Sequence, residues 1–318
     1  MPPAWINIRQ RIFRFSPDET TCARRGFHNG GVKASLHLEQ VGRAFVYGYD
    51  AALVDDDPHT LARQFDCLEP EWRGFAFEGA AMALALMDHL LPWKTNRLNN
   101  FLNGAAAPHV YMIHVGVGWT IGRLVWLRRN VDRWLNPLDS RLRWLAVDGY
   151  GFHEGYFHWS QSVVKQEIPK QLGGYGPRAF DQGLGRSLWF VDGADVNRIP
   201  VTIGKFPLAR QADLWSGVGL ACAYAGGVNV AAMETLRLAA GRYLPELAQG
   251  AAFAAKARLR AGIGVEHTDA ACQILCGQTA NSCAAVTDEA LANLPADGEE
   301  PAYEIWRQRI RATFGARN

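Results

Sequence analysis

The sequence predicts an all-α fold built from repeated helical hairpins of about 34 residues, and two observations support this prediction. A short pattern of small residues beside a larger one, as in VGVGW and DGYGF, recurs along the 318-residue chain. The flanking residues are rich in Ala, Leu, Met and Arg with a period near 3.6 residues, which is typical of helices. A tetratricopeptide-like α-solenoid and a closed α/α toroid both agree with this pattern.

A glycine stands near the start of each copy of the pattern. A spacing of 33 to 37 residues accommodates two helices of three to four turns and two short connections. Because a glycine inside a helix costs about 1 kcal/mol, its recurrence indicates that helices approach closely at these points. The seven leading glycines are Gly42, Gly79, Gly116, Gly149, Gly183, Gly217 and Gly250.

The pattern divides the chain into three parts. Residues 1–36 are expected to form an N-terminal helix and loop, and residues 37–292 the seven hairpin repeats. Residues 293–318 are expected to form a polar linker, LPADGEEPA, and a C-terminal cap helix, YEIWRQRIRATF. Five prolines support these repeat boundaries, because each precedes a copy of the pattern at a point where one helix would end and the next begin. They are Pro70, Pro108, Pro177, Pro207 and Pro245.

Composition excludes several classes of protein. Lys and Arg number 33 against 31 Asp and Glu, and no basic stripe occurs, so no nucleic-acid partner is expected. No apolar run is long enough for a transmembrane segment. The start of the chain does not resemble a secretory signal, and the six cysteines include no CxxC pair, so we expect reduced thiols and a cytoplasmic protein.

Metal ligands and cofactors are not expected from the motifs. Cys272 and Cys276 lie one helical turn apart and could bind a metal with His267, but buried packing is the favoured interpretation. His153 and His158 lie five residues apart, which separates them by about 140° on a continuous helix, so a shared zinc site is not expected. No dinucleotide-binding GxGxxG follows a predicted strand.

The residue before each leading glycine shares a helix face with the residues four and eight positions later. Several copies begin this face with a polar group and continue it with a large or aromatic one. If equivalent residues lie side by side, they line a cavity suited to a long unsaturated or polycyclic ligand. The alternative is that they pack between hairpins and contact no ligand. The predicted substrate-binding residues are Trp119, Phe152, Tyr156, Gln182, Arg186, Tyr224 and Gln249.

Acid-base chemistry is expected from carboxylates and histidines near this face. Glu78 in an apolar cavity would have a raised pKa and could donate a proton, unless it lies at the surface. Glu154 can orient the imidazole of His158, and a purely structural pair is an equal alternative. Asp181 and Arg186 could simply pair locally. The predicted catalytic residues are Glu78, Asp148, His153, Glu154 and Asp181, with His109 and His114 as further candidates.

Several long segments, among them RGFAFEGAAMALALMD, HVGVGWTIGRL, WLAVDGYGFHEGYFHW and LWSGVGLACAYAGGV, carry a resemblance over nearly the whole chain. The chain resembles an uncharacterised bacterial family of enediyne biosynthesis proteins, the UnbL-like group, a domain of unknown function. This resemblance implies a role in maturing a polyene-derived enediyne core beside an iterative polyketide synthase. It implies no particular catalytic residue or cofactor.

Two functional hypotheses follow. The first is an acid-base enzyme, isomerase-like or cyclase-like, that binds a small hydrophobic polyketide intermediate. The second is a non-catalytic helical-repeat scaffold that docks a polyketide synthase.

Overall fold

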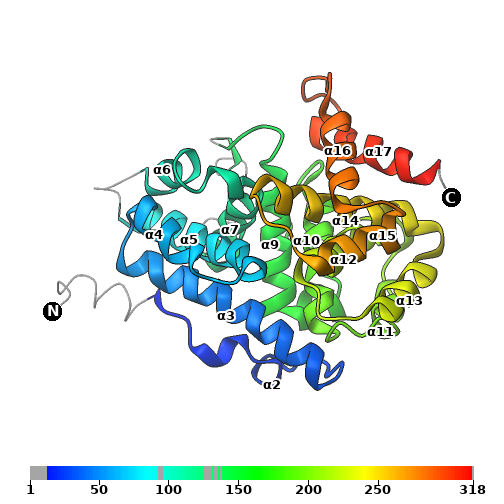
Figure 1. Cartoon of the computed structure of the whole chain (residues 1–318), viewed down its shortest axis with the longest axis horizontal. Coiled ribbons are helices and arrows are strands. Elements are labelled where there is room, and N and C mark those ends of the chain that lie inside the picture. Colours follow the sequence, from blue (N-terminus) through cyan, green and yellow to red (C-terminus); the bar gives the residue numbers. More distant parts are fainter. Residues whose placement is uncertain (1–12, 92–95, 125–130, 132–134, 137, 317–318) are drawn as a thin grey trace.

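The computed structural model describes residues 13–91, 96–124, 131, 135, 136 and 138–316, and every regular element in these residues is helical (Figure 1). The predicted all-α class is therefore confirmed. Part of the expected N-terminal helix, residues 1–12, lies outside the described residues. Among the helices described, none has an apolar stretch that could cross a bilayer.

A row of long helices forms the body of the protein, and each of them contacts the next in chain order. Each also contains one of the seven leading glycines. In Figure 1 the row runs from blue at the left, through green at the centre, to orange at the right. These helices are α3 (Val32–Val54), α5 (Pro70–Leu90), α7 (Val110–Arg123), α9 (Trp144–Phe157), α10 (Gly176–Val191), α12 (Leu208–Ala225) and α14 (Leu244–Arg260).

Six of the seven leading glycines lie where neighbouring long helices touch, whereas Gly42 packs against Thr20. A Cβ atom on Gly116 would overlap the carbonyl oxygen of Glu78, and one on Gly183 would overlap the carbonyl oxygen of Asp148. One turn beyond Gly116, the Thr120 hydroxyl donates a hydrogen bond to the Met82 carbonyl at 3.0 Å. The contacts occur in the same order along both helices, so α5 and α7 run parallel and equivalent residues lie side by side.

Replacing Gly183 by alanine is expected to lower the free energy of unfolding by about 1–3 kcal/mol, because the added methyl group would force α9 and α10 apart. Urea unfolding followed by circular dichroism would measure the loss. Gly204→Ala is the matched control, since a Cβ there meets no atom within 4 Å, and we expect no loss. An equal loss in both variants would contradict the packing role of Gly183.

Shorter elements precede, connect and follow the long helices. They are η1 (Pro17–Thr20), α2 (Cys22–Arg25), α4 (Pro58–Asp66), α6 (Arg97–Asn103), η2 (Ala107–His109), η4 (Ser160–Val164), α11 (Arg198–Gly204), α13 (Val230–Ala240), η5 (Gly241–Tyr243), α15 (Glu266–Cys276) and α16 (Ala280–Leu291). The hairpins are not uniform. Between α9 and α10 the chain forms only the π-helical turn η4, because Pro169, Gly173 and Gly174 disfavour a second helix.

The row curves so that distant helices meet at one end. The ring of Phe75 in α5 lies 5.2 Å, centroid to centroid, from the ring of Tyr224 in α12. The Arg258 guanidinium of α14 donates hydrogen bonds to the carbonyls of Pro70, Glu71 and Tyr224. These contacts enclose the interior at this end, while the choice between solenoid and toroid stays a prediction.

The C-terminal helix α17 (Ala302–Gly315) packs against α14 and α16. Its side chains Tyr303, Trp306 and Ile310 are almost fully buried, so the helix is part of the core. Arg307 is also fully buried, which requires charged partners inside the protein.

Candidate functional site

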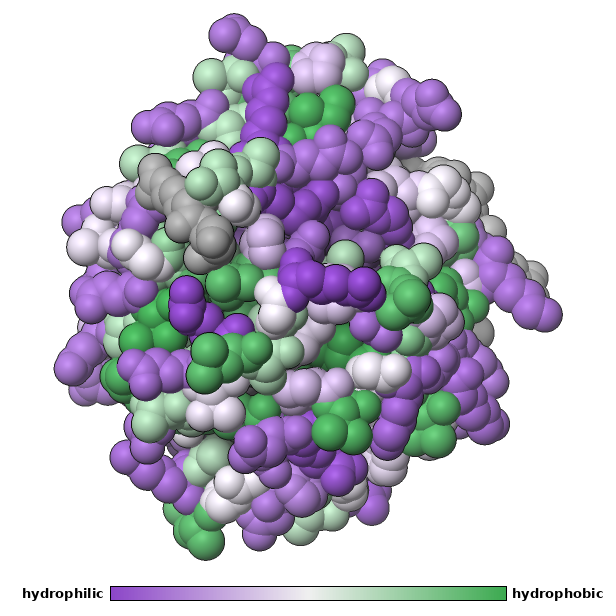
Figure 2. Space-filling model, turned by 90° about the vertical axis from the view of Figure 1, so that its right-hand side faces the viewer, coloured by the Kyte–Doolittle hydropathy of each residue, from purple (hydrophilic) through white to green (hydrophobic). Residues whose placement is uncertain are grey.

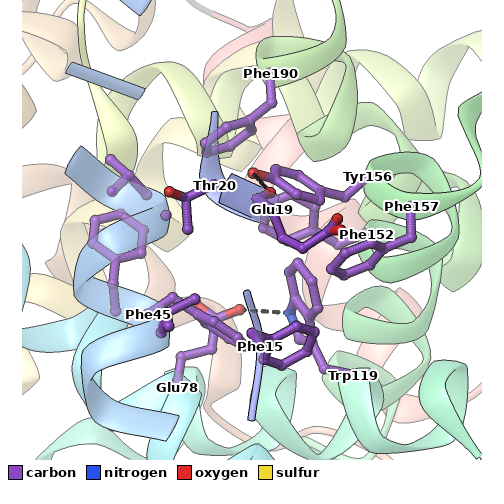
Figure 3. Close-up of a pocket in the computed structure, with 14 residues that line it drawn as sticks. Phe15, Glu19, Thr20, Phe45, Glu78, Trp119, Phe152, Tyr156, Phe157 and Phe190 are labelled. Carbon is purple, nitrogen blue, oxygen red and sulfur yellow. Dashed lines mark hydrogen bonds between the residues drawn. The ribbon is translucent and has the colours of Figure 1, made fainter. Parts of the chain in front are cut away.

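A narrow cavity of about 40 Å³ lies among α3, α5, α7, α9 and α10. Its wall is almost entirely apolar, and aromatic rings surround the space in Figure 3. Several of these rings come from equivalent positions of successive long helices, which the sequence pattern predicted to lie side by side. The aromatic lining residues are Phe15, Phe45, Phe75, Trp119, Phe152, Tyr156, Phe157 and Phe190.

Glu78 of α5 is the buried carboxyl group of this cavity. Its side chain is 1% exposed, so the alternative of a surface position is wrong. The Nε1–H of Trp119 donates a hydrogen bond to Oε1 at 2.9 Å, as Figure 3 shows. No hydrogen-bond donor among the described residues contacts the other oxygen, Oε2, although it is buried.

The environment of Glu78 favours its neutral form. Burial raises the pKa of this carboxyl from its usual 4.5 to about 7, against the opposing effects of the Arg186 charge and the Trp119 hydrogen bond. Both protonation states are therefore populated near neutral pH, as general acid-base chemistry requires. Because Oε1 already accepts the Trp119 hydrogen bond, Oε2 is the oxygen available to carry the proton.

Asp148 and Arg186 form a buried ion pair beside the cavity. Arg186 Nη1 lies 2.5 Å from Asp148 Oδ1, and Gln182 Nε2 donates to Asp148 Oδ2 at 2.8 Å. The Arg186 guanidinium also lies 4.7 Å from the ring centre of Phe152. Both carboxylate oxygens of Asp148 therefore have partners inside the protein.

Arg186 and Tyr224 line a second narrow cavity of about 30 Å³. This space lies among α7, α9, α10, α12, α14 and α17. The edge contact between Phe75, which lines the first cavity, and Tyr224 places the two cavities next to each other.

The predicted polar residues Gln182 and Gln249 belong to a buried network that includes α17. Gln182 Nε2 donates to the Tyr303 hydroxyl at 3.0 Å. Gln249 Oε1 accepts from the Ser216 hydroxyl at 2.8 Å and from Arg307 Nε at 3.1 Å. These two polar side chains, which were expected to face a ligand, therefore already form hydrogen bonds with other side chains of the protein.

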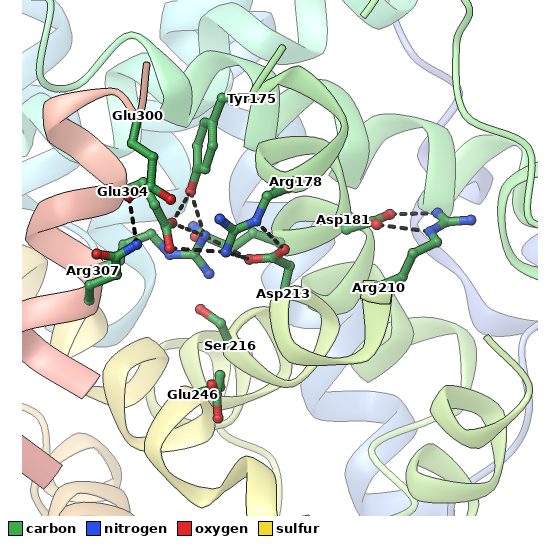
Figure 4. Close-up of polar contacts among 12 residues, drawn as sticks. Tyr175, Arg178, Asp181, Arg210, Asp213, Ser216, Glu246, Glu300, Glu304 and Arg307 are labelled. Carbon is green, nitrogen blue, oxygen red and sulfur yellow. Dashed lines mark hydrogen bonds and ion pairs between the residues drawn. The ribbon is translucent and has the colours of Figure 1, made fainter. Parts of the chain in front are cut away.

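Arg307 is the centre of an ion cluster that the sequence did not predict (Figure 4). Its Nη1 lies 2.8 Å from Asp213 Oδ1 and 3.2 Å from Glu304 Oε2, and it donates to the Tyr175 hydroxyl at 2.6 Å. Arg178 pairs with both carboxylates from the other side. The one available signal was the pair Glu304 and Arg307, spaced i, i+3 among the apolar residues of the terminal helix.

Asp181 lies outside the aromatic cavity and pairs with Arg210, at 2.5 and 2.8 Å (Figure 4). Burial raises its pKa to about 6, and the Arg210 charge opposes that rise. The local pair with Arg186 is not formed, so that alternative is wrong. Five residues separate the two on α10, which places them on different faces of the helix.

His153, Glu154 and His158 lie together at the C-terminal end of α9. The ring of His153 contacts Trp119, with centroids 5.7 Å apart. α9 ends at Phe157, and His158 follows it with a backbone that leaves the helical conformation (φ −129°, ψ 37°). One nitrogen from each histidine and one Glu154 oxygen all lie within 4.8 Å of one another.

The remaining candidates do not line the Glu78 cavity. His109 stacks on Phe77, with centroids 3.7 Å apart, and burial lowers its pKa to about 4. The Nδ1 atom of His114 is hydrogen-bonded to the Val110 carbonyl at 2.8 Å, and burial lowers its pKa too. His267 contacts the Tyr224 carbonyl at 3.1 Å.

Cys272 and Cys276 lie together with Cys283, and His267 is not part of this group. The Cys276 thiol lies 3.4 Å from the Ala248 carbonyl, and burial raises its pKa. This environment stabilises the protonated thiol.

The chain belongs to the family described as protein of unknown function (DUF1702), which matches residues 4–314. This membership agrees with the resemblance to an uncharacterised family. No match was found among curated proteins or among solved structures.

Proposed function

We propose that this DUF1702 protein binds an unsaturated, apolar ligand in the aromatic cavity and catalyses proton transfer on it, with Glu78 as the acid-base group. One observation carries the proposal: the Oε2 atom of Glu78 is buried in an aromatic-lined cavity without a hydrogen-bond donor. Leaving a polar atom buried in this way costs about 1–3 kcal/mol. A residue kept at that cost is a good candidate for a functional group.

The aromatic wall suits a conjugated substrate. Ring faces pack well against an extended π system, and they stabilise positive charge that develops when such a system is protonated. Trp119 contacts the carboxyl group of Glu78, and Phe45 and Phe152 pack against Trp119 in the same cavity wall, so these rings could serve both purposes.

The proposed reaction is an isomerisation. Glu78 gives its Oε2 proton to one carbon of a conjugated polyene, and a proton leaves a carbon further along the chain and returns to the carboxylate. The double bonds shift, the composition of the substrate is unchanged, and no co-reactant is needed. The ion pair of Asp148 and Arg186 would lie beside the reacting group but would transfer no proton.

The resemblance to enediyne biosynthesis proteins suggests the source of such a substrate. A polyene released by an iterative polyketide synthase in the cytoplasm would be a hydrophobic intermediate of the required kind. Docking to that synthase without catalysis is the competing function. Figure 2 gives it no support on the face shown, where hydrophilic and hydrophobic residues are mixed and no continuous apolar patch appears.

Incubation of the full-length protein with synthase-derived polyene in D₂O tests this function. We expect the absorption spectrum of the polyene to shift as its conjugation changes, and mass spectrometry to show deuterium in the product. An unchanged spectrum and mass, together with binding of the protein to the synthase, would support the scaffold and overturn the enzyme.

A further inference from the structure

A second group of reactive side chains, His153, Glu154 and His158, lies at the end of α9. His153 contacts Trp119, whereas Glu154 and His158 line an open surface pocket of about 350 Å³. Gln161, Ser162 and Glu167 lie on the same pocket wall. This group has no part in the proton transfer proposed for Glu78.

We propose that His153, Glu154 and His158 bind one divalent transition-metal ion of the Zn²⁺ class at the floor of this pocket. Two imidazoles and one carboxylate form a ligand set that Zn²⁺ and Fe²⁺ use in catalytic sites, where further coordination positions stay open. Here the open positions would face the pocket.

The spacing of the ligand atoms agrees with one shared ion. Glu154 Oε1 lies 3.0 Å from His153 Nδ1, and Glu154 Oε2 lies 3.4 Å from His158 Nδ1. Two ligands bound tetrahedrally to zinc at about 2.1 Å are about 3.4 Å apart. The carboxylate lies between the two imidazoles, so only small side-chain movements are needed to direct all three ligands at one ion.

The backbone holds His158 in this position. Because α9 ends at Phe157, the chain turns, and the π-helical turn η4 follows. The Ser162 hydroxyl lies within hydrogen-bonding distance of two carbonyls, those of Glu154 at 3.0 Å and of His158 at 3.1 Å. These contacts fix the backbone of His158 relative to the end of α9.

Gly122 of α7 provides space for the other imidazole. A Cβ atom at this position would overlap the ring of His153, including its Nδ1 atom. The absence of a side chain therefore lets the buried ring, 4% exposed, lie beside Glu154. Since the His158 side chain is 46% exposed, an ion can enter from solvent through the pocket.

Metal titration of the full-length protein tests the site. After removal of bound metal with a chelator, Zn²⁺ would be titrated by calorimetry, and Co²⁺ would report the ligand set through its visible absorption. We expect one ion per chain at this site and a rise in Tm with Zn²⁺. His158→Ala and Glu154→Gln should each weaken Zn²⁺ binding at least ~10-fold, since loss of even a supporting residue around a metal costs that much.

Two controls separate this site from other ligands. His59→Ala removes an exposed histidine of α4 and should leave Zn²⁺ affinity unchanged. Cys276→Ser changes the cysteine cluster and should also leave the His158-dependent binding unchanged. His153 is buried, so its replacement is judged only if the variant shows the wild-type circular dichroism spectrum.

The proposal would be overturned by any of three results. These are no saturable Zn²⁺ binding by the wild-type protein, equal affinity in the wild type and His158→Ala, or loss of all binding in Cys276→Ser alone.

Discussion

Replacement of Arg307 by methionine is expected to lower the free energy of unfolding by about 3 kcal/mol at pH 7. The guanidinium is fully buried and pairs with Asp213 and Glu304. Its removal therefore leaves two buried carboxylates with less positive charge to balance them. Arg178 still pairs with both, which limits the loss. Urea unfolding of the wild type and the variant would measure the difference.

Arg43→Met is the matched control for this replacement. Arg43 pairs with Glu39 one helical turn away and is 52% exposed, so its loss should cost less than about 0.5 kcal/mol. Equal losses in the two variants would show that the Arg307 cluster contributes no more than a surface pair.

The same cluster predicts how stability depends on acid. Burial alone would raise the pKa of Glu304, but Arg307, Arg311, Tyr175 and Arg178 outweigh that effect and lower it to about 2. A carboxyl with a lowered pKa stabilises the fold fully above its usual 4.5, and this contribution is lost as the pH falls through 2. Arg307→Met should therefore lose less stability than the wild type between pH 4.5 and 2.

The sequence predicted the long helices because their periodicity is local. Gly116 and Gly183 mark helix contacts that repeat along the chain, and the same spacing places Trp119 and Phe152 on one cavity wall. The segment between α9 and α10 departed from the repeat because glycine and proline there disfavour a helix. Periodicity could not show that departure, although composition could.

Glu78 could also be predicted as a site residue from its local sequence, because its neighbours in EGAAMALALMD are apolar. Phe15 was missed because it reaches the cavity from an N-terminal segment outside the repeats. Gln182 was expected to face a ligand, but Tyr303 approaches it from a helix more than a hundred residues away. Long-range contacts of this kind leave no periodic signal.

Glu78→Gln is expected to reduce turnover of the polyene by roughly 10²–10⁴-fold, because the amide keeps the shape of the side chain but cannot transfer the proton. The rate of double-bond shift would be measured by absorption. Glu234→Gln, which changes an exposed glutamate of α13, should keep the wild-type rate. Wild-type turnover by Glu78→Gln would remove Glu78 from the reaction.

The same variant has a second expected effect that needs no substrate. A carboxyl whose pKa is raised from 4.5 to about 7 binds its proton more tightly in the folded state, so wild-type stability should fall as the pH rises from 4.5 to 7. At about 1.4 kcal/mol per pKa unit, the penalty above pH 7 is roughly 3 kcal/mol. Glu78→Gln cannot ionise and should lose this pH dependence.

At pH 8 the variant should therefore be more stable than the wild type while it is inactive. Higher stability together with lost turnover would indicate that burial of this carboxyl serves catalysis at the expense of the fold. If the variant were instead less stable than the wild type at pH 8, Glu78 would hold the helices together, and its burial would give no reason to assign it a chemical role.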